Sequence, residues 1–179
     1  MEDRRSPLRG MVYAALFGAA TAVGAYIIIP FPIVPITLQT LFVALAASLL
    51  GGRLGALSQF IYLLLGIIGL PVFSGGKAGF GVLMGPTGGY LVGFIVGAYV
   101  TGRLMEIREK TTIAWTAFSI AAGFVVIYIL GVTQLSLVAK MALSKAISVG
   151  VIPFLIGDCL KVVLATLVVK KTRGKINVR

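Results

Sequence analysis

The stretch PFLIGDCLKVVLATLVV, residues 153–169, decides the fold class of this chain. The stretch is mostly apolar, and its length is close to the roughly 20 residues that a helix needs to cross a bilayer. It nevertheless contains Asp158 and Lys161. A charged side chain inside a membrane span costs about 2.5–3.5 kcal/mol on insertion scales, and such residues commonly mark functional sites. The stretch therefore predicts a membrane helix that carries a site.

The remainder of the chain has the same character. Of its 179 residues, 59% are hydrophobic and 12% are charged, and the mean hydropathy is +1.06. Recurrent apolar runs predict an all-α membrane protein, a single polytopic domain over residues 1–179 with six transmembrane helices. The expected spans are about 11–29, 36–50, 54–69, 86–105, 112–131 and 150–169.

Lysine and arginine are unevenly divided between the predicted loops. With a cytoplasmic N-terminus, twelve of the sixteen fall on the inner side, Lys161 falls within a span, and Lys77, Lys140 and Lys145 fall outside. This positive-inside bias predicts that both termini are cytoplasmic. The long glycine-rich loop 70–89 between the third and fourth helices then faces outward, and loops of this length are usually functional. Segment 132–149 is either a short amphipathic interfacial helix or an extension of the fifth span.

Four polar residues are expected at one level of the membrane. Asp158 and Lys161 are three residues apart, so their side chains share one helix face. They are either a neutralising pair or a ligand site with one acceptor anion and one donor cation. Gln39 and Tyr90 open the second and fourth spans and complete a small polar pocket with apolar walls. Alternatively, Gln39 only bridges helices and Tyr90 belongs to an interfacial belt, while back-bonding to the helix is the simpler role for Thr37 and Thr40.

Several function classes are disfavoured. The chain has no histidine and a single cysteine, Cys159, so we expect no metal site, no cofactor and no Ser-His catalysis. No P-loop motif is present, so this chain is not expected to hydrolyse ATP itself. Its formal charge of +11 lies beside apolar spans, which points to membrane lipid rather than nucleic acid as the counter-charge.

Four ordered motifs carry a family resemblance. PITLQT (35–40), LGALSQFIYLLLGIIGLPVFSGG (54–76), GPTGGYLVGF (85–94) and GDCLK (157–161) resemble the signature stretches of the BioY family. That family comprises the biotin-specific substrate-binding S components of energy-coupling-factor (ECF) transporters. The resemblance spans about residues 14–171 and implies a prokaryotic-type plasma-membrane protein that captures biotin from outside. The implied partners are a transmembrane coupling subunit and two cytoplasmic ATPase subunits.

The resemblance also implies roles for particular residues. Asp158 and Lys161 are expected to line the ligand, with Asp158 accepting a ureido N–H and Lys161 either meeting the carboxylate or holding Asp158 ionised. Residues 72–85, VFSGGKAGFGVLMG, are expected to serve as a lid. Within this lid we expect Phe73, Gly75 and Gly76 to contact biotin.

A stripe of small residues on the first helix is the implied docking surface for the coupling subunit. Two registers fit: Ala14, Gly18 and Ala22, or Ala15 and Ala19 one position on. Small residues at this spacing allow close helix approach in lipid, so internal packing is the other reading.

Two functions of other classes compete with biotin capture. The first is a stand-alone, proton-coupled secondary carrier of small molecules, in which Asp158 titrates during transport. The second is a purely structural membrane subunit without a ligand.

Overall fold

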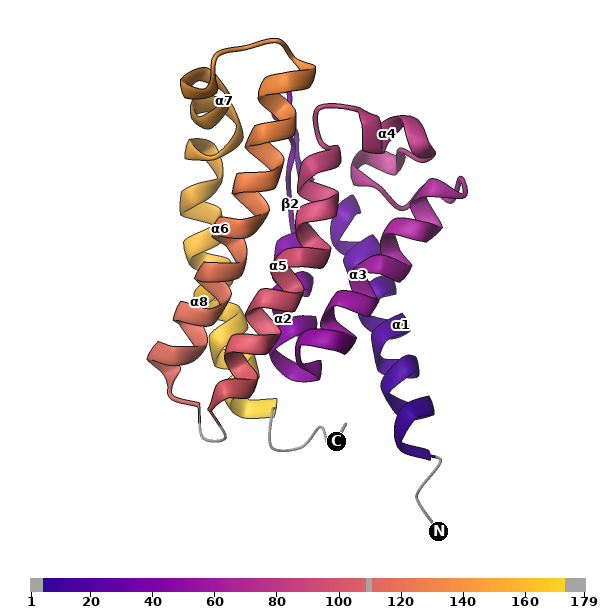
Figure 1. The fold of residues 1–179 in the computed structure, drawn as a ribbon, viewed down its shortest axis with the longest axis vertical. Helices are drawn as coiled ribbons and strands as arrows, with labels where there is room; N and C mark the ends of the chain where they lie inside the picture. Colours follow the sequence, from indigo (N-terminus) through magenta and orange to yellow (C-terminus); the bar gives the residue numbers. More distant parts are fainter. Residues whose placement is uncertain (1–4, 109–110, 173–179) are drawn as a thin grey trace.

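Eight α-helices form an elongated bundle in the computed structural model, which describes residues 5–108 and 111–172 (Figure 1). In chain order they are α1 Arg5–Tyr26, α2 Gln39–Leu50, α3 Gly52–Ile67, α4 Phe80–Met84, α5 Gly88–Ile107, α6 Ile113–Val138, α7 Leu143–Gly150 and α8 Leu155–Thr172. Two 3₁₀ turns, η1 Ser74–Gly76 and η2 Ile152–Phe154, precede α4 and α8. The start of α1 and the end of α8 lie at the same end of the bundle (Figure 1).

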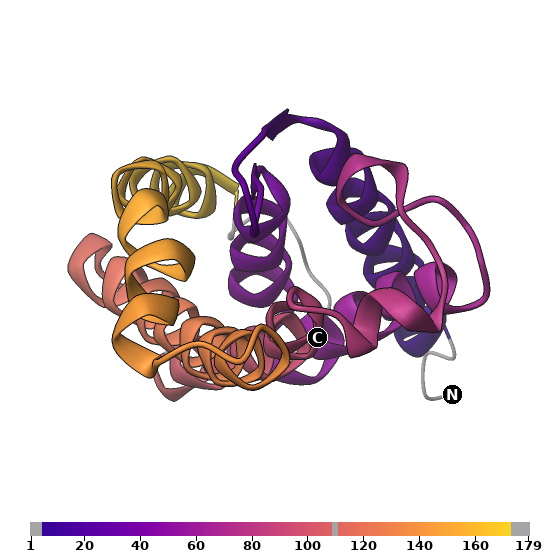
Figure 2. The same cartoon turned by 90° about the horizontal axis from the view of Figure 1, so that it is seen from above.

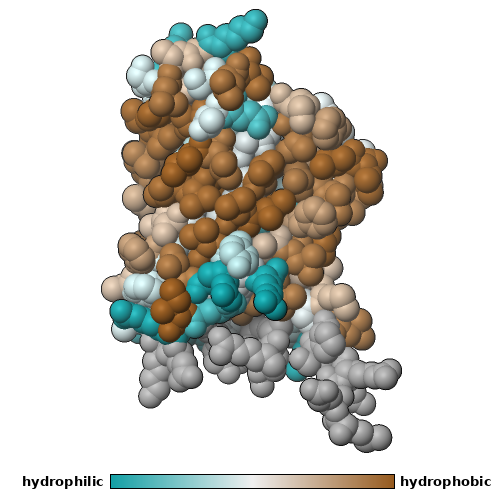
Figure 3. Space-filling model, viewed as in Figure 1, coloured by the Kyte–Doolittle hydropathy of each residue, from teal (hydrophilic) through white to brown (hydrophobic). Residues whose placement is uncertain are grey.

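Four helical stretches of the described residues are long and apolar enough to cross a membrane. They are Leu8–Tyr26, Gly88–Ile107, Ile113–Val138 and Leu143–Thr172, whereas α2 and α3 are apolar but shorter. On the face shown in Figure 3, hydrophobic residues cover the middle and hydrophilic residues gather toward the two ends. The chain is therefore an all-helical, multi-pass membrane protein. The predicted inner charges at residues 1–4, 109–110 and 173–179 lie outside the described residues.

The second predicted span begins later than expected. Pro30, Pro32 and Pro35 keep the chain before it extended, because proline fixes its own φ angle and disfavours the α conformation in the residue before it. Strand β1 Ile28–Ile29 consequently pairs antiparallel with strand β2 Ile36–Thr37. Helix α2 starts only at Gln39, so the polar residues Gln39 and Thr40 form its first turn, directly after strand β2.

The last third of the chain combines both readings of segment 132–149. Helix α6 continues to Val138, and a separate helix α7, amphipathic in sequence, follows from Leu143 to Gly150. Figure 2 shows α7 between the ends of α6 and α8. Pro153 lies in η2 rather than in α8, so α8 starts at Leu155, five residues later than predicted.

Glycines bring α5 and α6 into close contact. A Cβ atom at Gly93 would lie 2.9 Å from the Ile127 Cα, and one at Gly97 would lie 2.7 Å from the Gly123 carbonyl oxygen. The recurring glycines of α5 therefore pack against α6 inside the chain. Close approach at this seam positions the cavity-lining side chains of α5 against those of α6.

Candidate ligand-binding site

A cavity lies between α2, α5, α6 and α8, next to residues 72–85, the segment predicted to act as a lid and called the lid below. The volume of this cavity that is open to the centre of a water molecule is about 80 Å³. Its apolar wall includes Val34, Leu91, Phe94, Phe124, Ile127 and Phe154. A small set of polar side chains completes the lining, which is the usual composition of a site for a small organic ligand.

The two charges of α8 form a buried ion pair in this cavity. The Lys161 Nζ lies 2.8 Å from the Asp158 Oδ1. Asp158 is 7% exposed and Lys161 is 5% exposed. Desolvating two such charges costs several kcal/mol each, which their attraction offsets only when further hydrogen bonds satisfy the remaining polar atoms.

Hydroxyl groups from two other helices supply those further hydrogen bonds. Thr40 of α2 accepts from the Lys161 Nζ at 2.9 Å and donates to the Asp158 Oδ1 at 3.3 Å. Tyr128 of α6 donates its hydroxyl hydrogen to the Asp158 Oδ2. Residues of three helices therefore hold the pair in place. Each charged group has a hydrogen-bond partner besides the opposite charge.

Hydrogen-bonding capacity remains on both charged groups. A lysine ammonium has three N–H donors and a carboxylate has about four acceptor positions. Within the described residues, Lys161 uses two donors, and Asp158 accepts three hydrogen bonds. One N–H and one acceptor position are therefore available to a ligand that presents a carbonyl next to an N–H.

Gln39 links the cavity to the lid through a chain of hydrogen bonds. Its Nε2 donates to the Tyr62 hydroxyl, and its Oε1 accepts from the Thr37 Oγ1 at 2.7 Å. Tyr62 in turn donates to the Val72 carbonyl at 3.1 Å, where the lid begins. Gln39 lines the cavity, and one N–H of its amide has no hydrogen-bond partner among the described residues.

Tyr90 contributes its ring to the cavity. Its hydroxyl donates to the Gly150 carbonyl at the end of α7, at 2.9 Å. A side chain at Gly131 or Gly150 would overlap Tyr90, so these glycines provide the space in which it sits. The hydroxyl hydrogen of Tyr90 is thus committed to α7 and not to the cavity.

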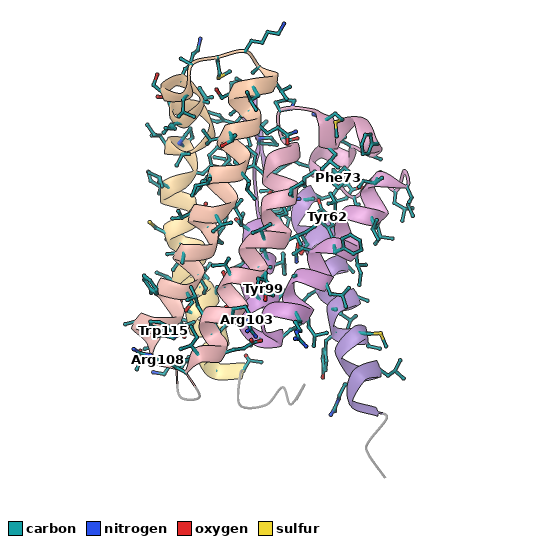
Figure 4. All side chains as sticks on the ribbon, viewed as in Figure 1. Tyr62, Phe73, Tyr99, Arg103, Arg108 and Trp115 are labelled. Atoms are coloured by element: carbon teal, nitrogen blue, oxygen red, sulfur yellow. The ribbon has the colours of Figure 1, made fainter. Side chains whose placement is uncertain are left out.

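Phe73 anchors the lid on α3. It is 1% exposed and packs so closely over Gly66 that a Cβ there would overlap its ring. Phe73 also contacts Tyr62 edge to face, with the ring centroids 5.7 Å apart (Figure 4). Gly75 and Gly76 follow with φ angles of 72° and 73° but do not line the cavity, whereas their neighbours Ser74 and Lys77 do.

Two side chains outside the lid hold its ends. Gln134 of α6 donates to the Leu83 and Gly85 carbonyls at 2.7 and 2.8 Å. Tyr26 of α1 donates to the Pro71 carbonyl, just before the lid. The lid is thereby attached to opposite sides of the bundle, through α6 and α1.

A model of the BioY family matches residues 1–177. The chain belongs to the BioY family.

Similar proteins of known name and structure extend over nearly the whole length of this BioY-family chain. The biotin transporter BioY of Thermotoga maritima is 48% identical over 161 residues, which cover 90% of this chain and 94% of the relative. The biotin transporter BioY of Rhizobium etli is 43% identical over 169 residues, covering 89% and 90%. The crystal structure of an S component for biotin from an ECF-type ABC transporter matches with a TM-score of 0.88 at 26% identity, covering 99% of this chain and 97% of that one.

The small residues on α1 of this BioY-family chain lie on two different faces. Ala14 and Gly18 are buried, and a Cβ at Gly18 would approach a backbone oxygen of α3 to 2.9 Å. Ala22 is half-buried beside them, whereas Ala15 and Ala19 are exposed. The first register therefore packs inside the chain, and only the second presents a small-residue surface to other molecules.

Two partners of the charged pair were not among the predicted site residues. Tyr128 is an isolated tyrosine in an apolar span. A buried tyrosine hydroxyl usually needs a hydrogen-bond partner, and this was the one feature of the sequence that could have indicated its place in the site. Thr40 was assigned to back-bonding but instead contacts both charges. Ser74 and Lys77 line the cavity in place of the two predicted glycines.

Proposed function

We propose that this chain is the subunit of an ECF-type uptake transporter that captures biotin. The observation that carries the proposal is a buried Asp158–Lys161 pair that lines the cavity and has one donor and one acceptor position unused among the described residues. Membership of the BioY family, and the relatives named as biotin transporters, support biotin as the ligand that uses these two positions. The proposed role is binding and delivery, not catalysis.

Biotin fits the chemistry of the cavity. Its ureido group has two N–H donors and a carbonyl, so one N–H can donate to Asp158 while the carbonyl accepts from Lys161. The bicyclic ring is apolar and suits the aromatic and aliphatic wall. A hydrogen bond to a charged group contributes about 1.5–3 kcal/mol, so two such bonds and burial of the ring support nanomolar binding, near −12 kcal/mol.

We further propose how the chain lies in the membrane and with what it assembles. Six spans with both termini in the cytoplasm of the plasma membrane place the lid on the outer face, where biotin arrives. The proposed partners are a transmembrane coupling subunit and two ATPase subunits. The exposed Ala15 and Ala19 on α1 are the proposed contact with the coupling subunit, because the other register is occupied by α3.

Mass spectrometry of the ligand retained by the detergent-purified chain tests the proposal directly. Biotin is expected in the protein fraction, and added biotin is expected to raise the melting temperature of ligand-free protein. Retention of another molecule without any effect of biotin would refute the proposed substrate. Accumulation by the chain alone in proteoliposomes, driven by a pH gradient, would instead support the proton-coupled carrier, and a chain that no ligand stabilises would be a structural subunit.

A further inference from the structure

Two polar groups at the rim of the cavity have no partner in the described structure. The Ser74 Oγ is shielded from solvent and makes no hydrogen bond. The Lys77 ammonium makes no ion pair or side-chain hydrogen bond among the described residues, and Lys77 itself is exposed. Both residues line the cavity. A shielded hydroxyl without a partner costs folding free energy, so its retention calls for an explanation.

The local backbone turns both side chains toward the same rim. The Phe73 N–H donates to the Lys77 carbonyl at 3.0 Å, and the Gly76 N–H donates to the Phe73 carbonyl at 2.9 Å. Gly75 and Gly76 lie between the two polar residues with positive φ angles, which glycine adopts without steric cost. The glycines thus shape a tight turn, and Ser74 and Lys77 flank them at the cavity.

The charges around the cavity decide where an anionic group of a ligand can lie. Lys161 is paired with Asp158 at 2.8 Å, so a carboxylate placed there would meet a buried like charge, which is unfavourable in a low dielectric. Among the described residues that line the cavity, Lys77 is the one cation without a carboxylate partner. An anion therefore fits at the lid and not beside the ion pair.

We infer that Ser74 and Lys77 bind the carboxylate of the ligand, while its uncharged ureido end meets Asp158 and Lys161. This inference rests on the proposed function and deepens it, because it fixes the direction of biotin in the cavity. The lid then recognises the ligand by charge as well as covering it. Recognition at the lid selects for a free acid, and recognition by α8 selects for the ring.

The test uses two ligands that differ only at the carboxylate. Binding of biotin and of biotin amide to the purified full-length chain is measured by calorimetry for the wild type, Lys77→Gln and Lys145→Gln. Lys145 is an exposed residue of α7 that does not line the cavity, so its variant controls for the loss of one positive charge. The wild type is expected to prefer biotin over the amide by about tenfold, which is the effect of one charge-assisted hydrogen bond.

Lys77→Gln should abolish this preference by weakening biotin alone, and Lys145→Gln should keep it. Equal weakening of both ligands by Lys77→Gln, or an unchanged preference, would overturn the inference while leaving biotin as the substrate. Absence of biotin binding by the wild type would overturn the proposed function itself, and this inference with it.

Ser74→Ala gives a second, independent measurement. Because the hydroxyl has no partner in the ligand-free chain, its removal should leave the melting temperature without biotin unchanged or higher, while biotin binds about fivefold to tenfold more weakly. Lower stability without biotin together with an unchanged affinity would show that Ser74 only supports the fold, and would contradict the inference.

Discussion

Separating the stability of the Asp158–Lys161 pair from its role in ligand binding is the most informative experiment on this fold. Lys161→Met removes the ammonium but keeps an apolar chain of similar length. The buried carboxylate then retains only the Thr40 and Tyr128 hydroxyls as hydrogen-bond partners among the described residues. Asp158→Asn is the matched change that neutralises the other partner without altering its shape.

The expected cost follows from the burial of both groups. Removing one partner of a buried ion pair typically costs 3–5 kcal/mol, because an uncompensated charge remains. The two hydroxyls still solvate Asp158, so we expect about 3 kcal/mol for Lys161→Met, the lower end of that range. The double variant leaves no buried charge and should recover about 2 kcal/mol, a coupling typical of residues in contact.

Thermal unfolding in detergent and calorimetric titration with biotin measure the two roles separately. Without biotin, the double variant should unfold at a higher temperature than Lys161→Met. Each variant should bind biotin at least tenfold more weakly than the wild type, since each loses a charge-assisted hydrogen bond worth about 1.5–3 kcal/mol. If the double variant binds biotin as tightly as the wild type, the pair only neutralises itself and the assigned binding role is wrong. If Lys161→Met is as stable as the wild type, the reasoning about buried charge is wrong as well.

Three further changes probe other parts of the molecule. Tyr128→Phe keeps the ring but removes the donor to Asp158, and calorimetry should show biotin affinity about tenfold weaker. Gly66→Ala places a methyl group where the Phe73 ring lies, and stopped-flow displacement should show faster release of biotin from a displaced lid. Ala15→Leu fills the exposed small-residue surface of α1, and co-purification with the coupling subunit should fall while biotin affinity of the isolated chain is unchanged.

Each of these changes has a matched control. Tyr99→Phe removes a hydroxyl outside the cavity and should leave affinity intact; an equal loss in both tyrosine variants would contradict the role of Tyr128. Gly81→Ala adds its methyl group to open space, so similar release rates from both glycine variants would argue against the Phe73 anchor. Ala121→Leu changes an exposed alanine of α6, and complex formation by Ala15→Leu at the same level as by this control would exclude the proposed surface.

Much of the helical architecture could be predicted from apolar runs, because membrane helices must be long and hydrophobic. The differences arise where proline and glycine act through tertiary contacts. Ile36 and Thr37 were assigned to a helix because the run is apolar, yet they form a strand because β1 lies within pairing distance. The 3₁₀ turn at Pro153 similarly delays the start of α8.

The candidate site could be predicted only in part. Asp158 and Lys161 stand out because charges are costly in an apolar span. Their partners Thr40 and Tyr128 are separated from Asp158 by 118 and 30 positions in the sequence, respectively. Whether these side chains reach Asp158 depends on how α2 and α6 are rotated about their axes. The orientation of α1 was undetermined for the same reason, since small residues occur on both of its faces and a periodic pattern does not distinguish them.

The placement of both charges on a single helix has an electrical consequence. Three residues along a helix correspond to an axial separation of about 4.5 Å, so any tilt or slide of α8 displaces a positive and a negative charge together. Carrying one elementary charge across a voltage of 100 mV involves about 2.3 kcal/mol, but opposite charges that travel together involve almost no net work. Joint movement of Asp158 and Lys161 is therefore nearly insensitive to the membrane voltage, and this pair cannot serve as a voltage-driven motor.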